Sequence, residues 1–264
     1  MTSTENTPIE NKIISTKKYN CTQLTPQGDF ERHVYNRDAF AHYFRWSHAL
    51  DMLRRDMKVL DFGCGSGEFA EVIYRNRMKS EYYLGYDIRK KTIANNKQKV
   101  IDKFNSQDWI NFAVADLCDK DFIAPRNDFD LIVSFEVIEH IGRGNGPVFL
   151  ENMVKHMNEN TTALISTPCF NGKCAKNHII DGKVGEFEYE ELKELLKRYF
   201  VIENVFGTFC SQRDIKAHIP ETLQPFYDEL KKFHHPTVLA VMFAPLFPAQ
   251  SRNCIWQLKL KKQE

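Results

Sequence analysis

The sequence has no apolar run long enough to cross a lipid bilayer. Its longest apolar stretch, residues 237–247, is interrupted by Pro245 and falls short of the roughly 20 residues that a membrane-spanning helix needs. The opening residues, MTSTENTPIENK, are polar and lack the apolar segment of a secretion signal. We therefore expect neither an integral membrane segment nor export.

Paired cysteines and an excess charge of one sign are also missing. The seven cysteines include no CxxC pair, and their odd number argues against a disulfide framework and against a structural zinc site. A reducing, cytoplasmic compartment is the expectation. Because 36 Lys and Arg balance 35 Asp and Glu, the formal net charge is +1 and predicts no overall attraction to nucleic acid or to a membrane surface.

What the sequence does have is an alternation of strand and helix patterns. We expect strands at 58–62, 81–86, 110–115, 130–135, 163–167, 200–206 and 254–260, with helices at 68–76, 90–104, 148–157 and 190–198. This order is typical of an α/β protein with helices on both faces of a parallel sheet. The pattern predicts a Rossmann-like, doubly wound and mostly parallel sheet of seven strands.

Two segments lie outside this alternation. Residues 1–54 should form a polar tail followed by a helical cap, in front of a main domain at 55–264. Residues 207–252 are inserted between the last two strands and include Arg213 and Lys216. The sixth strand should run parallel to the others, so the insertion would begin on the ligand side of the sheet. We therefore expect it to be a lid over the bound substrate.

The strongest motif is VLDFGCGSGEF at residues 59–69. A strand runs into a turn containing Gly63, Gly65 and Gly67, which opens a helix, and such a turn lets the backbone approach a ligand closely. Asp61 lies on the strand, where a carboxylate can face a cationic amino group. Asp87 ends the second strand about twenty residues later, where an acid takes both ribose hydroxyls.

A further acid, Asp116, and its neighbour Leu117 follow the third strand. The whole set resembles the class I methyltransferases that depend on S-adenosyl-L-methionine (SAM), and the resemblance covers about residues 55–205. It implies that the glycine turn and Asp61 hold the methionine end of SAM, that Asp87 holds the ribose, and that Asp116 and Leu117 border the adenine. The alternatives for such a glycine-rich turn are an NAD-binding dehydrogenase and a purely structural turn that binds no ligand.

After the fourth strand comes FEVIEHI, with Glu136, Glu139 and His140 spaced to share one face of a helical turn. The ExxEH pattern is similar to that of ubiquinone-pathway O-methyltransferases and small-RNA 2′-O-methyltransferases, in which the matching residues bind a divalent metal. His178, after the fifth strand, matches a further histidine of the small-RNA enzymes. The resemblance implies a site for Mn, Fe, Co, Zn or Mg at these four residues. Glu136 and His140 are the candidate catalytic residues, and without metal they would be an acid/base pair or part of the pocket wall.

Three functions are compatible with these motifs. Metal-assisted O-methylation of a small-molecule or nucleotide-like hydroxyl fits the ExxEH pattern. An RNA or DNA methyltransferase whose basic insertion holds the strand is a second, and it would bind polyanions in a salt-dependent way. A SAM-binding regulatory module without catalysis is the third. Stretches such as NHIIDGKVGEFEYEELKELL also resemble methyltransferases common in bacteriophage genomes.

Overall fold

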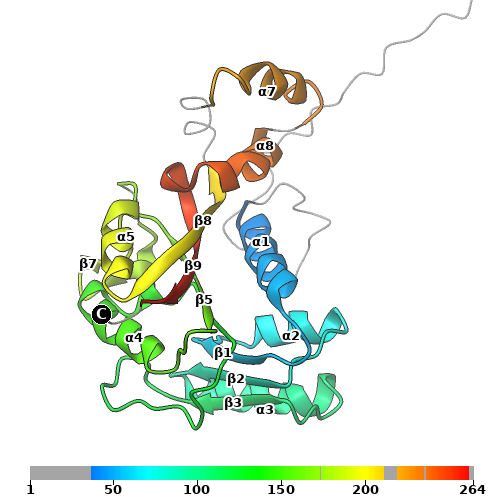
Figure 1. Ribbon diagram of the computed structural model, residues 1–264, viewed down its shortest axis with the longest axis vertical. Helices are drawn as coiled ribbons and strands as arrows, with labels where there is room; N and C mark the ends of the chain where they lie inside the picture. The colour runs from blue at the N-terminus through cyan, green and yellow to red at the C-terminus, as the bar shows by residue number, and fades with distance from the viewer. Residues whose placement is uncertain (1–36, 173, 211–218, 235, 262–264) are drawn as a thin grey trace, which may run out of the picture.

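The computed structural model describes residues 37–172, 174–210, 219–234 and 236–261. Its central sheet has seven strands in the order β3-β2-β1-β4-β5-β9-β8 (Figure 1). These strands are β1 (Lys58–Phe62), β2 (Tyr82–Asp87), β3 (Ile110–Val114), β4 (Leu131–Phe135), β5 (Thr162–Pro168), β8 (Phe200–Cys210) and β9 (Ser251–Leu260). Strand β9 is antiparallel to both β5 and β8, so β8 runs parallel to the remaining strands. The predicted Rossmann-like, mostly parallel sheet is confirmed.

Helices cover both faces of this sheet. The helices are α1 (Arg37–Met52), α2 (Glu68–Arg75), α3 (Lys90–Lys103), α4 (Gly146–Val154), α5 (Tyr189–Lys197), α7 (Gln224–Leu230) and α8 (Pro236–Phe243), of which α7 lies beyond β8 and apart from the sheet (Figure 1). Successive side chains of β1 alternate between the faces: Val59 packs in a core with Phe69 and Ile73 of α2, whereas Leu60 packs in a second core with Phe149 of α4. The helix expected before the first strand is α1.

The order of the strands determines where a ligand can bind. Strand β1 lies between β2 and β4, so the chain leaves its carboxyl end toward one side and later returns on the other. Ligands of such sheets bind in the crevice at this reversal, beyond the carboxyl ends of the strands. The glycine turn after β1, the end of β2 and the segment after β4 all meet there.

The insertion begins later than its predicted start, because β8 continues to Cys210 rather than ending at residue 206. Arg213 and Lys216 fall within 211–218, outside the described residues. Helices α7 and α8 share a small apolar core that includes Tyr227, Leu239 and Phe243, and α8 packs against β8 and α1. Among the described residues, no helix combines the length and the apolar character that crossing a bilayer requires.

Candidate active site

A cavity of about 670 Å³ lies at the carboxyl ends of β1, β2, β3 and β4. Its size is within the range of small-molecule and cofactor sites. Helix α1 supplies part of its wall through His42, Arg45 and Trp46. The cavity wall also contains most of the site residues expected from the sequence, namely Asp61, Gly63, Gly65, Asp87, Asp116, Leu117, Glu136 and His140.

The three glycines after β1 all have positive φ, but for different reasons. A Cβ on Gly63, at φ +100, would lie 2.4 Å from Cγ2 of Val137, and one on Gly67, at φ +75, would lie 3.0 Å from Cζ of Phe112. Gly67 therefore serves the packing of α2 against the sheet and does not line the cavity. Gly65, at φ +55, lines the cavity as Gly63 does and is the least crowded of the three, since a Cβ there would come no closer than 3.4 Å, to Oε2 of Glu68.

Asp87, the last residue of β2, ties the glycine turn to the start of α3. Its carboxylate accepts hydrogen bonds from the backbone N–H of Gly65 at 3.2 Å and of Arg89 at 2.9 Å. The Arg89 guanidinium donates to both carboxylate oxygens, at 2.9 and 3.1 Å. Burial alone would raise the pKa of Asp87, but the hydrogen bonds and charge of Arg89 outweigh it, so the pKa is lowered. An acid whose ionised form is favoured thus faces the cavity where a ribose is expected.

The pKa of Asp61, on β1, is shifted in the opposite direction to that of Asp87. Its carboxylate is buried and accepts a hydrogen bond from the Tyr83 hydroxyl at 2.5 Å. Burial, only partly offset by this hydrogen bond, raises the pKa of Asp61 to about 7. A cationic ligand group in the cavity would favour the ionised form of Asp61.

Asp116 and Leu117 form the edge of the cavity after β3. The carboxylate of Asp116 accepts a hydrogen bond from the backbone N–H of Cys118 at 2.9 Å, which fixes the turn, and Leu117 is buried. An apolar side chain beside a polar, exposed one suits the face and edge of an adenine.

The spacing predicts that Glu136 shares one helical face with Glu139 and His140. The structure contradicts this prediction. Glu136 has φ +58, and the short 3₁₀ turn that follows, η3, spans only Ile138–His140. Its carboxylate is therefore turned toward α1 and β9: it forms an ion pair with Arg45 at 2.7 Å and accepts hydrogen bonds from Asn253 at 2.9 and 3.0 Å. Burial raises the pKa of Glu136, but the Arg45 charge and the Asn253 hydrogen bonds lower it further than burial raises it.

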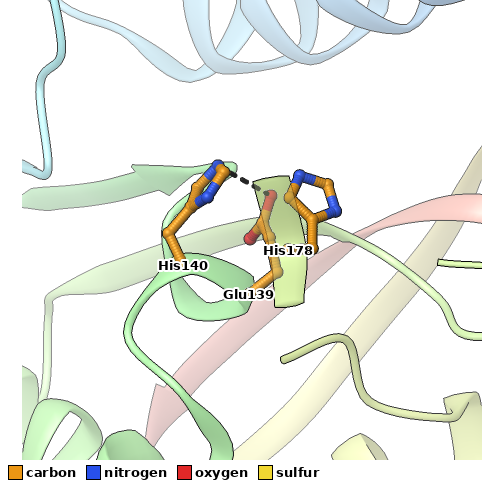
Figure 2. A group of neighbouring side chains, drawn as sticks. All are labelled: Glu139, His140 and His178. Carbon is orange, nitrogen blue, oxygen red and sulfur yellow. Dashed lines mark ion pairs between the residues drawn. The ribbon is translucent and has the colours of Figure 1, made fainter. Parts of the chain in front are cut away.

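Glu139, His140 and His178 come together instead, with their ligand atoms within 4.8 Å of one another (Figure 2). The His140 and His178 rings are 4.7 Å apart between centroids, and His140 Nε2 is 4.0 Å from Glu139 Oε1. Three of the four predicted metal ligands are thus neighbours. Glu136 is not one of this group.

The environment of Glu139 fits a cation. The side chain is fully buried, and one oxygen accepts a hydrogen bond from Thr167 at 2.9 Å. The other, Oε1, has no hydrogen-bond partner among the described residues. Burial and the nearby Glu136 raise the pKa of Glu139 well above its usual range, and burial together with His178 lowers the pKa of His140. One carboxyl group and two imidazoles around an unsatisfied oxygen form a donor set suited to a divalent transition metal.

Three polar residues of this region carry no motif in the sequence. The Asn253 amide donates a hydrogen bond to Glu136. The Arg252 guanidinium donates a hydrogen bond to the buried Glu186, whose carboxylate is also hydrogen-bonded to His178. Glu186 lies within the stretch NHIIDGKVGEFEYEELKELL, next to Gly185, but nothing in its spacing relates it to His178 as a partner. Only the fold brings these residues together.

Comparisons with known proteins agree with this architecture. A family model described as "Methyltransferase domain" matches residues 33–219. The phosphoethanolamine N-methyltransferase of Plasmodium falciparum (isolate 3D7) is 23% identical over 183 residues, which are 69% of this chain and 62% of that protein. The chain therefore spans less than two thirds of that relative's length.

Two solved structures illustrate the shared fold. A TehB-like SAM-dependent methyltransferase from Corynebacterium glutamicum ATCC 13032 has a TM-score of 0.53 at 18% identity, covering 85% of this chain and 98% of that one. Phosphoethanolamine N-methyltransferase 2 of Haemonchus contortus, in complex with S-adenosyl-L-methionine, has a TM-score of 0.56 at 15% identity, covering 91% and 61%.

Proposed function

This chain belongs to the methyltransferase domain family and is a SAM-dependent enzyme, and we propose that it methylates a hydroxyl oxygen with the help of a divalent metal ion. The observation that carries the proposal is the unsatisfied Oε1 of Glu139 beside His140 and His178. His140 also lines the cofactor cavity, so the cluster and the cavity share a wall.

We assign the cofactor roles as the resemblance to SAM-dependent methyltransferases implies, and the position of these residues in the cavity wall supports the assignment. Asp87 takes the ribose hydroxyls, Asp116 and Leu117 border the adenine, and Asp61 faces the methionine ammonium. Gly63 and Gly65 line the cavity and let the backbone approach the cofactor, whereas Gly67 supports the packing of α2 behind the turn. SAM supplies an already activated methyl group, so the protein has to position the acceptor and remove its proton.

Glu139, His140 and His178 are the residues that would hold the metal. A bound divalent ion would lower the pKa of the acceptor hydroxyl as a Lewis acid. With its lowered pKa, His140 is neutral near pH 7 and offers a ring nitrogen to the ion or to the leaving proton. Glu136, held by Arg45 and Asn253, remains a carboxylate facing the cavity beside the acceptor rather than a metal ligand.

The acceptor class is a small molecule or a nucleotide-like hydroxyl. Helices α7 and α8 would form a lid over it, since α8 packs against β8 and against α1, which lines the cavity. Hydrogen exchange should show α7 and α8 opening more readily than β1 and β4, and gaining protection once cofactor and acceptor are bound. Exchange unchanged by any ligand would make this segment a structural appendage.

Metal titration of the metal-free protein, with S-adenosylhomocysteine present, tests the proposal. We expect one site that binds Mn²⁺, Fe²⁺, Co²⁺ or Zn²⁺ more tightly than Mg²⁺, because two imidazoles favour ions that accept nitrogen. Glu139→Gln should lose this site, whereas Glu190→Gln, on the exposed face of α5, should keep it. Turnover of a hydroxyl acceptor that is unaffected by EDTA in metal-free protein would overturn metal assistance.

An amine acceptor is the second candidate, and the similarity to phosphoethanolamine N-methyltransferases favours it. An amine needs only to lose its proton before attack, and neutral His140 in the cavity wall could accept it. Transfer to ethanolamine phosphate or a related amine without added metal, lost in His140→Ala, would support this acceptor over a hydroxyl.

A further inference from the structure

Glu186 is a buried carboxylate that neither the cofactor site nor the metal cluster uses directly. It lies between α5 and the hairpin formed by β6 (Ile179–Ile180) and β7 (Lys183–Val184), and its side chain is fully buried. Its Oε1 is 2.6 Å from Nδ1 of His178. The hydrogen bond joins Glu186 to the one proposed metal ligand that lies outside the ExxEH segment.

Glu186 is itself held from two directions. The Arg252 guanidinium, on β9, forms an ion pair with its carboxylate at 2.7 Å, so the buried negative charge is compensated. The Arg143 guanidinium donates to the Glu186 backbone carbonyl at 2.9 and 3.1 Å. Because both its backbone and its carboxylate are held, Glu186 can keep the ring of His178 in one orientation.

The hairpin also fixes how far His178 lies from Glu139. Gly185 passes so close to η3 that a Cβ there would lie 2.1 Å from the backbone oxygen of Glu139. The Gly185 N–H donates to the His178 carbonyl at 2.8 Å, which closes the hairpin against that turn. His178 and Glu139 are thus kept adjacent by backbone packing as well as by side chains.

A second metal site is the competing explanation, because Cys174, His178 and Glu186 also place ligand atoms within 4.8 Å of one another. The Arg252 cation, however, lies against the Glu186 carboxylate and repels a second cation. The Cys174 thiol lies 3.4 Å from the backbone carbonyl oxygen of Ala175 and 3.7 Å from that of His178, so it already has hydrogen-bond acceptors within the protein. This arrangement suits a hydrogen-bonded support better than a metal site.

We propose that Glu186 is a positioning residue, which accepts the Nδ1–H of His178 so that Nε2 is unprotonated and directed to the site shared with Glu139 and His140. A carboxylate behind a metal-binding histidine fixes its tautomer and ring orientation and strengthens it as a ligand. The proposal rests on the metal site of the proposed function. It assigns to Arg252, through Glu186, the same supporting role.

Two measurements test it. Nitrogen-15 NMR of the metal-free protein should show His178 with its proton on Nδ1, and Glu186→Gln should move His178 toward the Nε2–H form. In titrations with Mn²⁺ or Zn²⁺, Glu186→Gln should weaken binding about 10–100-fold, while Glu186→Asp keeps part of the affinity. The affinity for SAM should stay within about twofold, since Glu186 does not line the cofactor cavity.

An Nε2–H tautomer of His178 in the wild-type protein, or wild-type metal affinity in a folded Glu186→Gln variant, would overturn the proposal. Failure of the proposed function has a different signature, because the wild-type protein itself would then bind no metal. The tautomer is measured without metal, so it still decides the role of Glu186 in that case and in the case that Glu186→Gln does not fold. Glu190→Gln is the control for loss of one carboxylate from the same region.

Discussion

The two halves of the site are built in different ways. The cofactor half comes from neighbouring loops between Asp61 and Leu117, and its contacts are mainly between backbone and nearby side chains. The chemistry half pairs side chains across long separations, such as Asn253 with Glu136, 117 residues apart. In both halves two acids have their pKa values moved in opposite directions, Asp87 against Asp61 and Glu136 against Glu139. A pair of carboxylates with opposite pKa shifts can thus arise from a local turn as well as from a long-range network of side chains.

Gly65→Val should give the largest effect in the cofactor half. At φ +55 a β-branched residue is strongly disfavoured, and the turn that exposes Gly65 to the cavity would have to change. We expect SAM binding to fall below detection in calorimetry while the far-UV circular dichroism stays that of a folded protein. Gly172→Val is the control, since Gly172 has φ +90 with nothing within 4 Å of its Cβ position. Normal SAM affinity in Gly65→Val would show that this turn is not the cofactor loop.

Asp87→Ala should weaken SAM binding by about 1.5–3 kcal/mol, because the ribose hydroxyls lose a charged acceptor. Isothermal titration calorimetry measures this directly. The matched control is Asp102→Ala, on the exposed side of α3, where the carboxylate accepts a hydrogen bond from Gln98. Unchanged affinity in a folded Asp87→Ala protein would remove Asp87 from the ribose site.

The variant Arg45→Met tests the chemistry half of the site through its effect on the free energy of unfolding. Removing the guanidinium leaves Glu136 without its charge partner, and we expect the free energy of unfolding to fall by about 2 kcal/mol. The loss is below that of a fully enclosed pair because the Glu136 side chain is 27% exposed, toward the cavity. Adding Glu136→Gln to Arg45→Met should recover about half of it in urea denaturation. Additive losses in the double variant would mean that the two residues do not stabilise each other.

The pH dependence of SAM binding should be the smallest effect. The pKa of Asp61 is raised to about 7 by burial, and the SAM ammonium favours its ionised form, so affinity rises as pH increases through 7. Between pH 6 and 7.5 we expect about an eightfold gain, from the change in ionised fraction. Asp61→Asn should bind more weakly and with a flatter profile. If the pH profile of the wild-type protein is as flat as that of Asp61→Asn, the Asp61 carboxylate does not interact with the SAM ammonium.

The sequence predicts the cofactor half better than the chemistry half for a physical reason. A glycine turn after a strand, with an acid at the end of the next strand, depends on local backbone geometry that the chain records in consecutive residues. Glu136 depended on one backbone angle, φ +58, which the helical spacing of ExxEH did not reveal. Glu186 and Arg252 carry no local signal, because their roles exist only once β9 lies beside β5.

Strand β9 is synthesised late, and this determines when two carboxylates of the site can acquire their partners. Its adjacent residues Arg252 and Asn253 project to opposite sides of the strand, one toward Glu186 and the other toward Glu136. Synthesis proceeds from the N-terminus, so Glu136 leaves the ribosome 117 residues before its partner Asn253. The ribosome therefore delivers the complete glycine turn and Asp87 early, and the partners of the Glu136 and Glu186 carboxylates late.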